Sequence, residues 1–240
     1  MADNADQRKV PIGRVTLYNV RCSFPDLWTK RSFQGSDGSS SKPRLKCNFL
    51  IPKSEVKAPG RAKYKGKKVS FAEALKRSKF DAIAAKLGEA EARTMLKKIK
   101  PDSYALRDGD METWDGYEGC YYVSSGNTRN VQVVGRDKTP VTEESGTIYG
   151  GCYVNGVVTF WFQKAGKTPK GEPLSNAVWA TLEAVQFYDK GEAFGASAVN
   201  VEEEFDDVTG DFDDPIDGDG HPDEDDDFGR GVDDDGDDLL

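Results

Sequence analysis

The sequence has a single histidine and no long apolar run, and each of these absences excludes a class of protein. The histidine, His221, lies among the aspartates near the C-terminal end. A Ser-His-Asp or Cys-His nucleophile in the body of the chain is therefore excluded, because no imidazole is present there to act as its base. No segment approaches the roughly eighteen apolar residues of a membrane span, and the first residues lack the apolar core of a secretory signal. We expect a soluble, intracellular protein.

The four cysteines include no Cys-x-x-Cys pair. Cys22, Cys47, Cys120 and Cys152 are scattered through apolar, strand-like segments. This pattern favours buried free thiols over a zinc site or a disulfide framework. A phosphate-binding loop of the form GxxxxGK[ST] is absent as well. We predict neither a cofactor nor a metal ion.

Charge is divided unevenly along the chain. Residues 201–240 contain twenty Asp and Glu against the single basic residue Arg230. Because the net charge of the whole chain is −9, residues 1–200 carry about +10. We therefore predict a folded domain over residues 1–200 and an acidic tail over 201–240, whose few scattered hydrophobic residues predict disorder. The asymmetry indicates a nucleic acid or an acidic partner.

The body of the chain is mainly β in pattern. Apolar alternation predicts a strand over residues 13–24, ended by Pro25, and a second over 44–52. Residues 70–88 have helical spacing, with Ser70 and Glu73 as a capping pair and Gly88 as a stop, and a further helical turn ends before Pro101. Four more strand segments, rich in Val, Tyr, Phe and Trp, lie within residues 119–126, 130–135, 148–163 and 177–189.

Six strands with a helical insertion after the second favour a small barrel over a sandwich. We predict a mainly β, OB-fold-like (oligonucleotide-binding) barrel with a helical insertion between early strands, followed by the disordered acidic tail.

The largest cationic signal lies between Lys42 and Lys100, where eighteen Lys and Arg stand against five Asp and Glu. Charge of this size attracts phosphates, although lysines on a helix and its flanking loop can also do no more than solvate a surface. The basic residues that we predict to contact nucleic acid are Lys30, Arg31, Arg44, Lys46, Lys63, Lys65, Lys67, Lys68, Lys164 and Lys167.

Unpaired bases stack on aromatic rings, and the sequence has such rings beside its charges. Each strand aromatic can equally belong to the core. Neighbours such as Tyr121 and Tyr122 point to opposite faces of a strand, so one of them should be accessible. By the same alternation Phe160 and Phe162 are assigned to the core, and the role of Trp161 stays open. The predicted stacking residues are Trp28, Phe33, Tyr121, Tyr149 and Tyr153.

A cluster of carboxylates offers a remote alternative. Asp108, Asp110, Glu112 and Asp115 lie within a few residues of one another and could hold Mg²⁺ for a nuclease. Their Asp-Gly spacing is more typical of a tight turn. We expect no catalytic residue here.

Six segments, in order, resemble one family of bacteriophage proteins: "VRCSFPDLW", "FLIPK", "LRDGD", "GYEGCYYV", "IYGGCYVNGVVTFWFQ" and "SNAVWATLEAVQFYDKGEAFG". The family is that of proteins similar to an enterobacterial phage single-stranded DNA-binding protein, and the resemblance covers nearly all of residues 13–195. It implies an OB fold, sequence-independent binding of single-stranded DNA during phage DNA replication or recombination, an acidic C-terminal tail, and a location in the cytoplasm of the infected bacterial host.

We therefore expect single-stranded DNA as the partner and no enzymatic activity. The tail is expected to compete for the DNA groove and to dock phage replication or recombination proteins. Exposed strand edges leave a homodimer open. The alternative is an RNA-binding or duplex-binding architectural protein, since stacking and charge serve either sugar.

Overall fold

The computed structural model describes residues 10–32, 40–168 and 171–195. Phe33, the acidic segment 201–240 and the domain boundary predicted at residue 200 lie outside these ranges, so the predictions made for them remain predictions.

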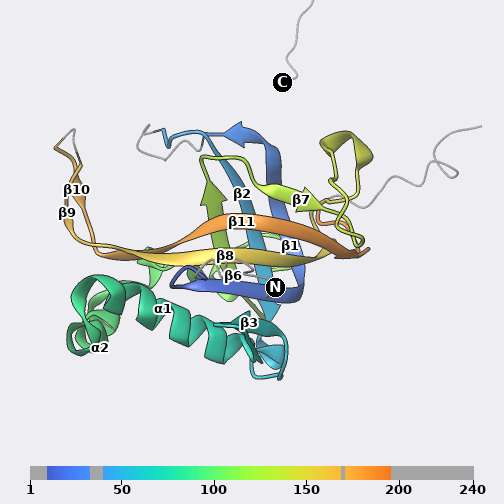
Figure 1. Cartoon of the computed structure of the whole chain (residues 1–240). Coiled ribbons are helices and arrows are strands. Elements are labelled where there is room, and N and C mark those ends of the chain that lie inside the picture. The colour runs from blue at the N-terminus through green and yellow to red at the C-terminus, as the bar shows by residue number, and fades with distance from the viewer. Residues whose placement is uncertain (1–9, 33–39, 169–170, 196–240) are drawn as a thin grey trace, which may run out of the picture. The chain divides into compact units, whose positions relative to one another are not determined.

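Five long strands close into a barrel, as Figure 1 shows. They are β1 (Arg14–Arg31), β2 (Arg44–Pro52), β6 (Cys120–Asn127), β8 (Tyr153–Gln163) and β11 (Ala177–Asp189). The order around the barrel is β1-β2-β6-β11-β8, and β8 pairs with β1 to close it. Numbered along the chain this is 1-2-3-5-4-1, a five-stranded Greek-key barrel of the OB type. The predicted mainly β, OB-like barrel is confirmed.

One seam of the barrel differs from the others. Four of the five strand pairings are antiparallel, whereas β6 and β11 run parallel and share the single pair Gly126↔Thr181. The Asn127 amide reinforces this seam by donating to the Leu182 carbonyl at 2.7 Å. The two strands are thus joined at one point of the ladder.

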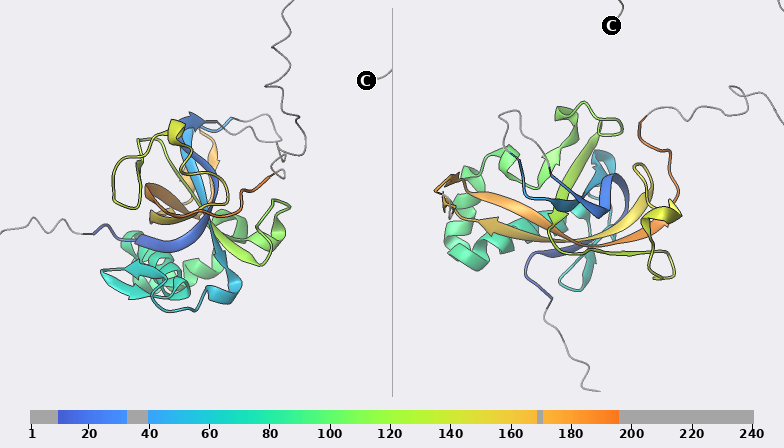
Figure 2. Two further views of the ribbon diagram at one scale, coloured as in Figure 1. Left: turned by 90° about the vertical axis from the view of Figure 1, so that its right-hand side faces the viewer. Right: turned by 90° about the horizontal axis from the view of Figure 1, so that it is seen from above.

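Short elements connect the long strands. They are η1 (Lys53–Glu55), β3 (Ala62–Tyr64), β4 (Lys67–Val69), η2 (Pro101–Ser103), β5 (Leu106–Asp108), η3 (Gly109–Met111), β7 (Gln132–Val134), η4 (Glu143–Ser145), β9 (Gly166–Lys167) and β10 (Pro173–Leu174). Figures 1 and 2 show that the β9–β10 hairpin continues the paired ribbon of β8 and β11 beyond the barrel.

The helical insertion lies between the second and third barrel strands, as predicted. It consists of α1 (Phe71–Leu87) and α2 (Glu89–Lys98), which lie together on one side of the barrel (Figure 2). Ser70 Oγ accepts a hydrogen bond from the Glu73 N–H at 3.2 Å, and Gly88 ends α1 with φ +83°, a backbone that favours glycine. The predicted cap and stop are confirmed. Neither helix of the described residues is long and apolar enough to cross a membrane.

The core is formed by alternate residues of the barrel strands. Phe160 and Phe162 are buried, which confirms their assignment to the core. Gly156 lies against the ring of Phe49, and a Cβ built at Gly156 would approach that ring to 2.5 Å. Only glycine therefore fits at this point of β8.

The cysteines of the described chain are all free thiols, which confirms the prediction of free cysteines. Cys22, Cys47 and Cys152 are fully buried, whereas Cys120 is half-buried. The sulfur atoms of Cys22 and Cys47 lie 3.3 Å apart inside the barrel.

The prediction that the first strand ends at Pro25 is wrong. β1 continues to Arg31, and its pairing with β2 resumes at Asp26↔Lys46 after a break that follows Ser23. The break is a β-bulge, in which extra residues on one strand leave the ladder. A proline is tolerated there because its missing N–H is not needed by a partner.

We predict that Gly156→Ala lowers the free energy of unfolding by ~1–3 kcal/mol, because the added methyl overpacks the core against Phe49. Urea denaturation measures the change. Gly166→Ala is the matched control, since a Cβ there has no neighbour within 4 Å; its effect should stay within ~0.5 kcal/mol. Equal stability of the two variants would contradict the packing described for β8.

Candidate nucleic-acid interface

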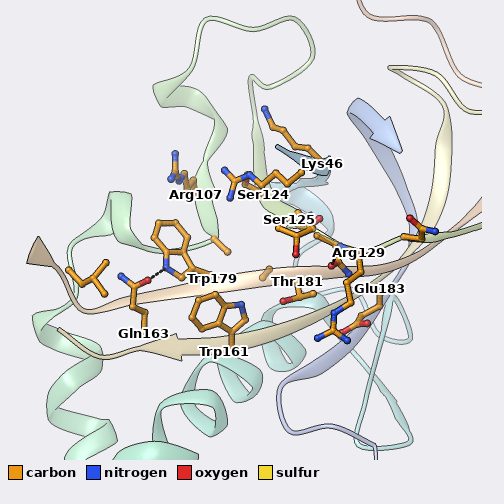
Figure 3. Close-up of a pocket in the computed structure, with 18 residues that line it drawn as sticks. Lys46, Arg107, Ser124, Ser125, Arg129, Trp161, Gln163, Trp179, Thr181 and Glu183 are labelled. Carbon is orange, nitrogen blue, oxygen red and sulfur yellow. Dashed lines mark hydrogen bonds between the residues drawn. The ribbon is translucent and has the colours of Figure 1, made fainter. Parts of the chain in front are cut away.

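A trough of about 980 Å³ lies on the outer surface of the barrel over the parallel seam. β2, β6, β8 and β11 all contribute to its lining, together with β5 and the connection from β6 to β7. Figure 3 shows the lining side chains above the ribbons of β8 and β11. Besides small, polar and apolar residues and one carboxylate, Glu183, the lining contains four cations and two tryptophans: Arg44, Lys46, Arg107, Arg129, Trp161 and Trp179.

The two tryptophans form a cross-strand pair. The antiparallel register of β8 and β11 sets Trp161 directly opposite Trp179, so both indoles lie on the same face of the sheet. Trp161 is 41% exposed. Trp179 Nε1 donates to Gln163 Oε1 at 3.1 Å, which fixes the orientation of that ring (Figure 3). The pair is a preformed stacking surface, and the role of Trp161, which the sequence left open, is to line the trough.

Arg44 and Lys46 enter the trough from β2. They are two residues apart in a strand, so both point to the outer face. Gly126 of β6 lies beneath them, because a Cβ built there would be 3.1 Å from Arg44 Cδ and 3.0 Å from the Leu45 carbonyl oxygen. The absence of a side chain at the seam thus leaves room for the stem of Arg44.

Arg107 and Arg129 enter from the other side of β6. Arg107 Nε donates to the Tyr104 carbonyl at 3.2 Å, and one terminal nitrogen donates to the Asp102 carbonyl at 3.1 Å. These bonds hold the guanidinium without neutralising its charge. Arg129 is exposed at the start of the β6–β7 connection, where its own N–H donates to Asn127 Oδ1.

Within the described chain, the four trough cations form no ion pair with a carboxylate. Cations elsewhere do: Lys53 Nζ lies 2.6 Å from Asp108 Oδ1, and Arg136 lies 2.6 Å from Asp189 Oδ1. Burial holds the pKa of Lys46 below its usual value, and although Asp26 opposes the shift, the charges of Arg44 and Arg107 add to it. Converging, unpaired positive charge of this kind is typical of an anion site.

Several predicted contact residues border the trough. Arg44 and Lys46 line it. Lys30 and Arg31 are exposed at the end of β1, and Arg31 pairs with Arg44 in the strand register. Lys164 and Lys167 are exposed in the segment that joins β8 to β11, directly after Gln163. These two connections flank the strands in the places where OB folds hold oligonucleotides.

Four of the aromatic residues predicted to stack on bases are described by the structure, and all four lie outside the trough. Trp28 packs on the core and donates from Nε1 to the Val141 carbonyl at 3.2 Å. Tyr121 is half-buried beneath Lys53, whose Nζ is 5.1 Å from the ring centroid. Tyr149 donates to the Gly191 carbonyl at 2.8 Å, and the ring of Tyr153 lies beside Arg21. None of the four lines the trough.

The remaining predicted cations lie on the β3–β4 hairpin, which pairs with the edge of β1. The hairpin packs on α1, since Tyr64 donates to Asp81 Oδ2 at 2.7 Å and Lys65 Nζ lies 2.5 Å from the same oxygen. All four lysines are exposed, and none lines the trough: Lys63, Lys65, Lys67 and Lys68.

The sequence did not predict Arg107, Trp179 or Arg129 as nucleic-acid contacts. Trp161 could have been placed from strand alternation, because Phe160 and Phe162 take the core face. The position of Trp179 opposite it depends on the register across the β9–β10 hairpin, and that of Arg107 on the pairing of β5 with β6. Neither pairing has a local signal.

The carboxylates considered for a metal have protein partners. Lys53 Nζ bridges Asp108 and Asp110, and Asp110 Oδ1 also accepts from the Gly119 N–H at 2.7 Å. The ion pair with Lys53 and that hydrogen bond hold the pKa of Asp110 below its usual value. Glu112 accepts from the Tyr122 hydroxyl at 2.5 Å. The cluster thus pins the loop from β5 to β6, and no group of three or more metal-ligating residues occurs in the part of the chain described.

A 1-2-3-5-4-1 barrel whose outer face carries a cationic, tryptophan-lined trough between its loops belongs to the OB-fold class. A match between the sequence and a family profile identifies the family within this class. The profile of the family described as Enterobacter phage Enc34, ssDNA-binding protein, covers residues 13–216, and the chain belongs to this family. The family resemblance found in the sequence is confirmed.

The chain is also similar to individual proteins. Protein p50 of Acyrthosiphon pisum secondary endosymbiont phage 1 is 32% identical over 198 residues, which span 82% of this chain and 94% of p50. The single-stranded DNA-binding protein from bacteriophage Enc34, solved in complex with ssDNA, is 22% identical, with a TM-score of 0.49 over 76% of this chain and 90% of its own. Gp2.5 of bacteriophage T7, a single-stranded DNA-binding protein, is 11% identical, with a TM-score of 0.40 over 80% and 94%.

We predict that Arg107→Gln raises the pKa of Lys46, because a neighbouring like charge is removed, and that Asp26→Asn lowers it further, because the opposing carboxylate is lost. Titration of lysine side chains labelled with ¹³C, followed by NMR, measures both shifts. Should the pKa of Lys46 be unaffected by Arg107→Gln, the two cations do not share one field and the anion site is misassigned.

Proposed function

We propose that this protein binds single-stranded DNA without regard to sequence, in phage DNA replication or recombination, and that no bond is made or broken in the process. One observation carries the proposal: four cations that form no ion pair with a carboxylate of the described residues lie with a cross-strand pair of tryptophans in the trough of an OB barrel. The named activity of the Enc34 protein and the shared family support it.

The chemistry of the trough favours an unpaired strand. The phosphates neutralise Arg44, Lys46, Arg107 and Arg129, whose mutual repulsion is relieved when an anion enters. The exposed face of Trp161 offers each base a π-surface worth ~1–3 kcal/mol, and this surface is available only to a base that has left its duplex stack. Because every base has such a face, the arrangement is tolerant of sequence.

The substrate is tested by competition. Fluorescence anisotropy with a labelled oligonucleotide should rank single-stranded DNA above duplex of equal length, and an RNA competitor distinguishes the alternative of RNA binding. Affinity should fall with salt, at a slope of about −0.7 per phosphate contact. A preference for duplex, or an affinity independent of salt, would disprove the proposal.

We predict that Trp161→Leu lowers affinity for single-stranded DNA roughly tenfold, because one stacking surface is lost. Arg107→Gln should reduce the magnitude of the salt slope by about 0.7. Lys86→Gln, an exposed cation of α1 outside the trough, is the matched control and should change neither quantity. The same measurement on Lys67→Gln and Lys68→Gln tests the predicted contacts of the β3–β4 hairpin.

The acidic segment 201–240 gives the proposed site a competitor within the same chain. Its twenty carboxylates are tethered to a cationic trough, so their effective concentration there is high. We propose that the segment occupies the trough when DNA is absent, and that once displaced it meets replication or recombination proteins. The host cytoplasm is where such encounters would occur.

We predict that truncation after Asn200 tightens binding of single-stranded DNA at low salt and has less effect at high salt, because screening already weakens the tail. Titrations of the intact and truncated proteins at two salt concentrations measure the difference. If both bind equally at both concentrations, the segment does not compete for the trough.

A further inference from the structure

An aromatic cluster with two exposed rings adjoins the trough. Phe24 and Trp114 are 41% and 42% exposed and meet edge to face, with ring centroids 5.2 Å apart. Beneath them Tyr117 and Tyr122 are buried, and Trp114 lies 5.1 Å from Tyr117. The outer pair therefore rests on a rigid aromatic base that keeps its rings in solvent.

Lys46 and Arg107 join the cluster to the trough. Lys46 lines the trough, and its Nζ lies 5.0 Å from the centroid of the Phe24 ring. Arg107 lies opposite Tyr122 in the pairing of β5 with β6, so this second trough cation is beside the cluster as well. Burial raises the pKa of Tyr122 to about 12, and the charge of Arg107 opposes the shift. A strand whose phosphates contact both cations passes within reach of the exposed rings.

The backbone at Phe24 is strained. Its φ is +47°, in the left-handed region that bulky residues rarely adopt, and it lies in the bulge where β1 leaves the β2 ladder. The bulge turns Phe24 outward, while its neighbour Ser23 stays buried. Backbone strain of this kind is concentrated at binding and active sites, and here it holds an apolar ring at the surface.

The loop that presents Trp114 is held by side-chain contacts that precede the indole in sequence. Lys53 bridges Asp108 and Asp110 at its start, and Glu112 accepts from Tyr122 within it. The indole is therefore held before any ligand arrives, which reduces the entropy lost on binding.

We propose that Phe24 and Trp114 form a second base-stacking subsite, which extends the path of a single strand from the Trp161–Trp179 trough across Lys46. This inference rests on the proposed function and adds to it: the trough alone accommodates a short strand, and the second subsite is reached only by a longer one. The occupant is a nucleobase of the strand whose phosphates lie in the trough, because Lys46 both lines the trough and lies against the Phe24 ring.

The test uses oligothymidylates of two lengths with the full chain, about 5 and about 15 nucleotides, within the range of site sizes known for OB folds. Phe24→Asn and Trp114→Leu should leave affinity for the short strand within twofold, and should lower affinity for the long strand about tenfold. Tyr188→Leu is the matched control: this exposed aromatic lies on β11 outside the trough, and its loss should affect neither strand.

Asparagine suits the left-handed backbone at position 24. Phe24→Asn should therefore unfold at a temperature no lower than the parent chain, so a loss of affinity cannot be attributed to misfolding. In the long strand, abasic nucleotides beyond those that fill the trough should abolish the effect of Trp114→Leu, because the ring then has no base to stack on.

The outcomes separate the two proposals. If Trp161→Leu weakens both strands while Phe24→Asn and Trp114→Leu behave like Tyr188→Leu, the second subsite is wrong and the trough stands. If the parent chain does not favour single-stranded DNA at all, the proposed function itself fails. If the cluster variants weaken the short strand as much as the long one, the rings belong to the trough and there is no separate subsite.

Discussion

The parallel seam between β6 and β11 is the constraint on which the rest of the site depends. A 1-2-3-5-4-1 barrel must bring its third and fifth strands together in parallel, and here a single residue pair, Gly126↔Thr181, does so. The trough lies over this seam, and Gly126 leaves space for Arg44 to cross it. Closure of the barrel and formation of the site are thus two consequences of the same strand order.

Two groups of basic side chains in the folded part differ, those that form ion pairs with carboxylates and those that line the trough. Lys53, Arg61, Lys65, Arg77 and Arg136 all have carboxylate partners, and these pairs stabilise loops and helix surfaces. Among the described residues, the trough cations form no such ion pairs. Burial is the main cause of the depressed pKa of Lys46, and the charges of Arg44 and Arg107 add to it. A surface of this kind is less stable empty than filled, which is how an anionic ligand gains affinity without sequence-specific contacts.

Two groups of aromatic rings differ as well, buried rings of the interior and exposed rings of the surface. Tyr117 and Tyr122 are buried and support the exposed rings of Phe24 and Trp114. Phe160 and Phe162 are buried on the core face of β8, whereas Trp161 is exposed on the other face. An exposed ring is useful for stacking only if it is held in place, and packing against buried neighbours holds it. The two exposed groups lie on either side of Lys46, so one lysine connects both aromatic surfaces.

Local pattern determined the elements of this protein: the strand alternation that buries Phe160 and Phe162, the Ser70 cap and Gly88 stop of α1, and the excess of positive charge in the body over the acidic segment. Arg44 and Lys46 followed from that pattern because their strand has one basic face. Tertiary structure alone decided which charges and rings meet. The lysines of 63–68 lie on a hairpin beside α1. Strand register places Arg107 and Trp179 in the trough, and loop packing places Trp114 at its edge. Those contacts join residues distant in sequence, and no local periodicity encodes them.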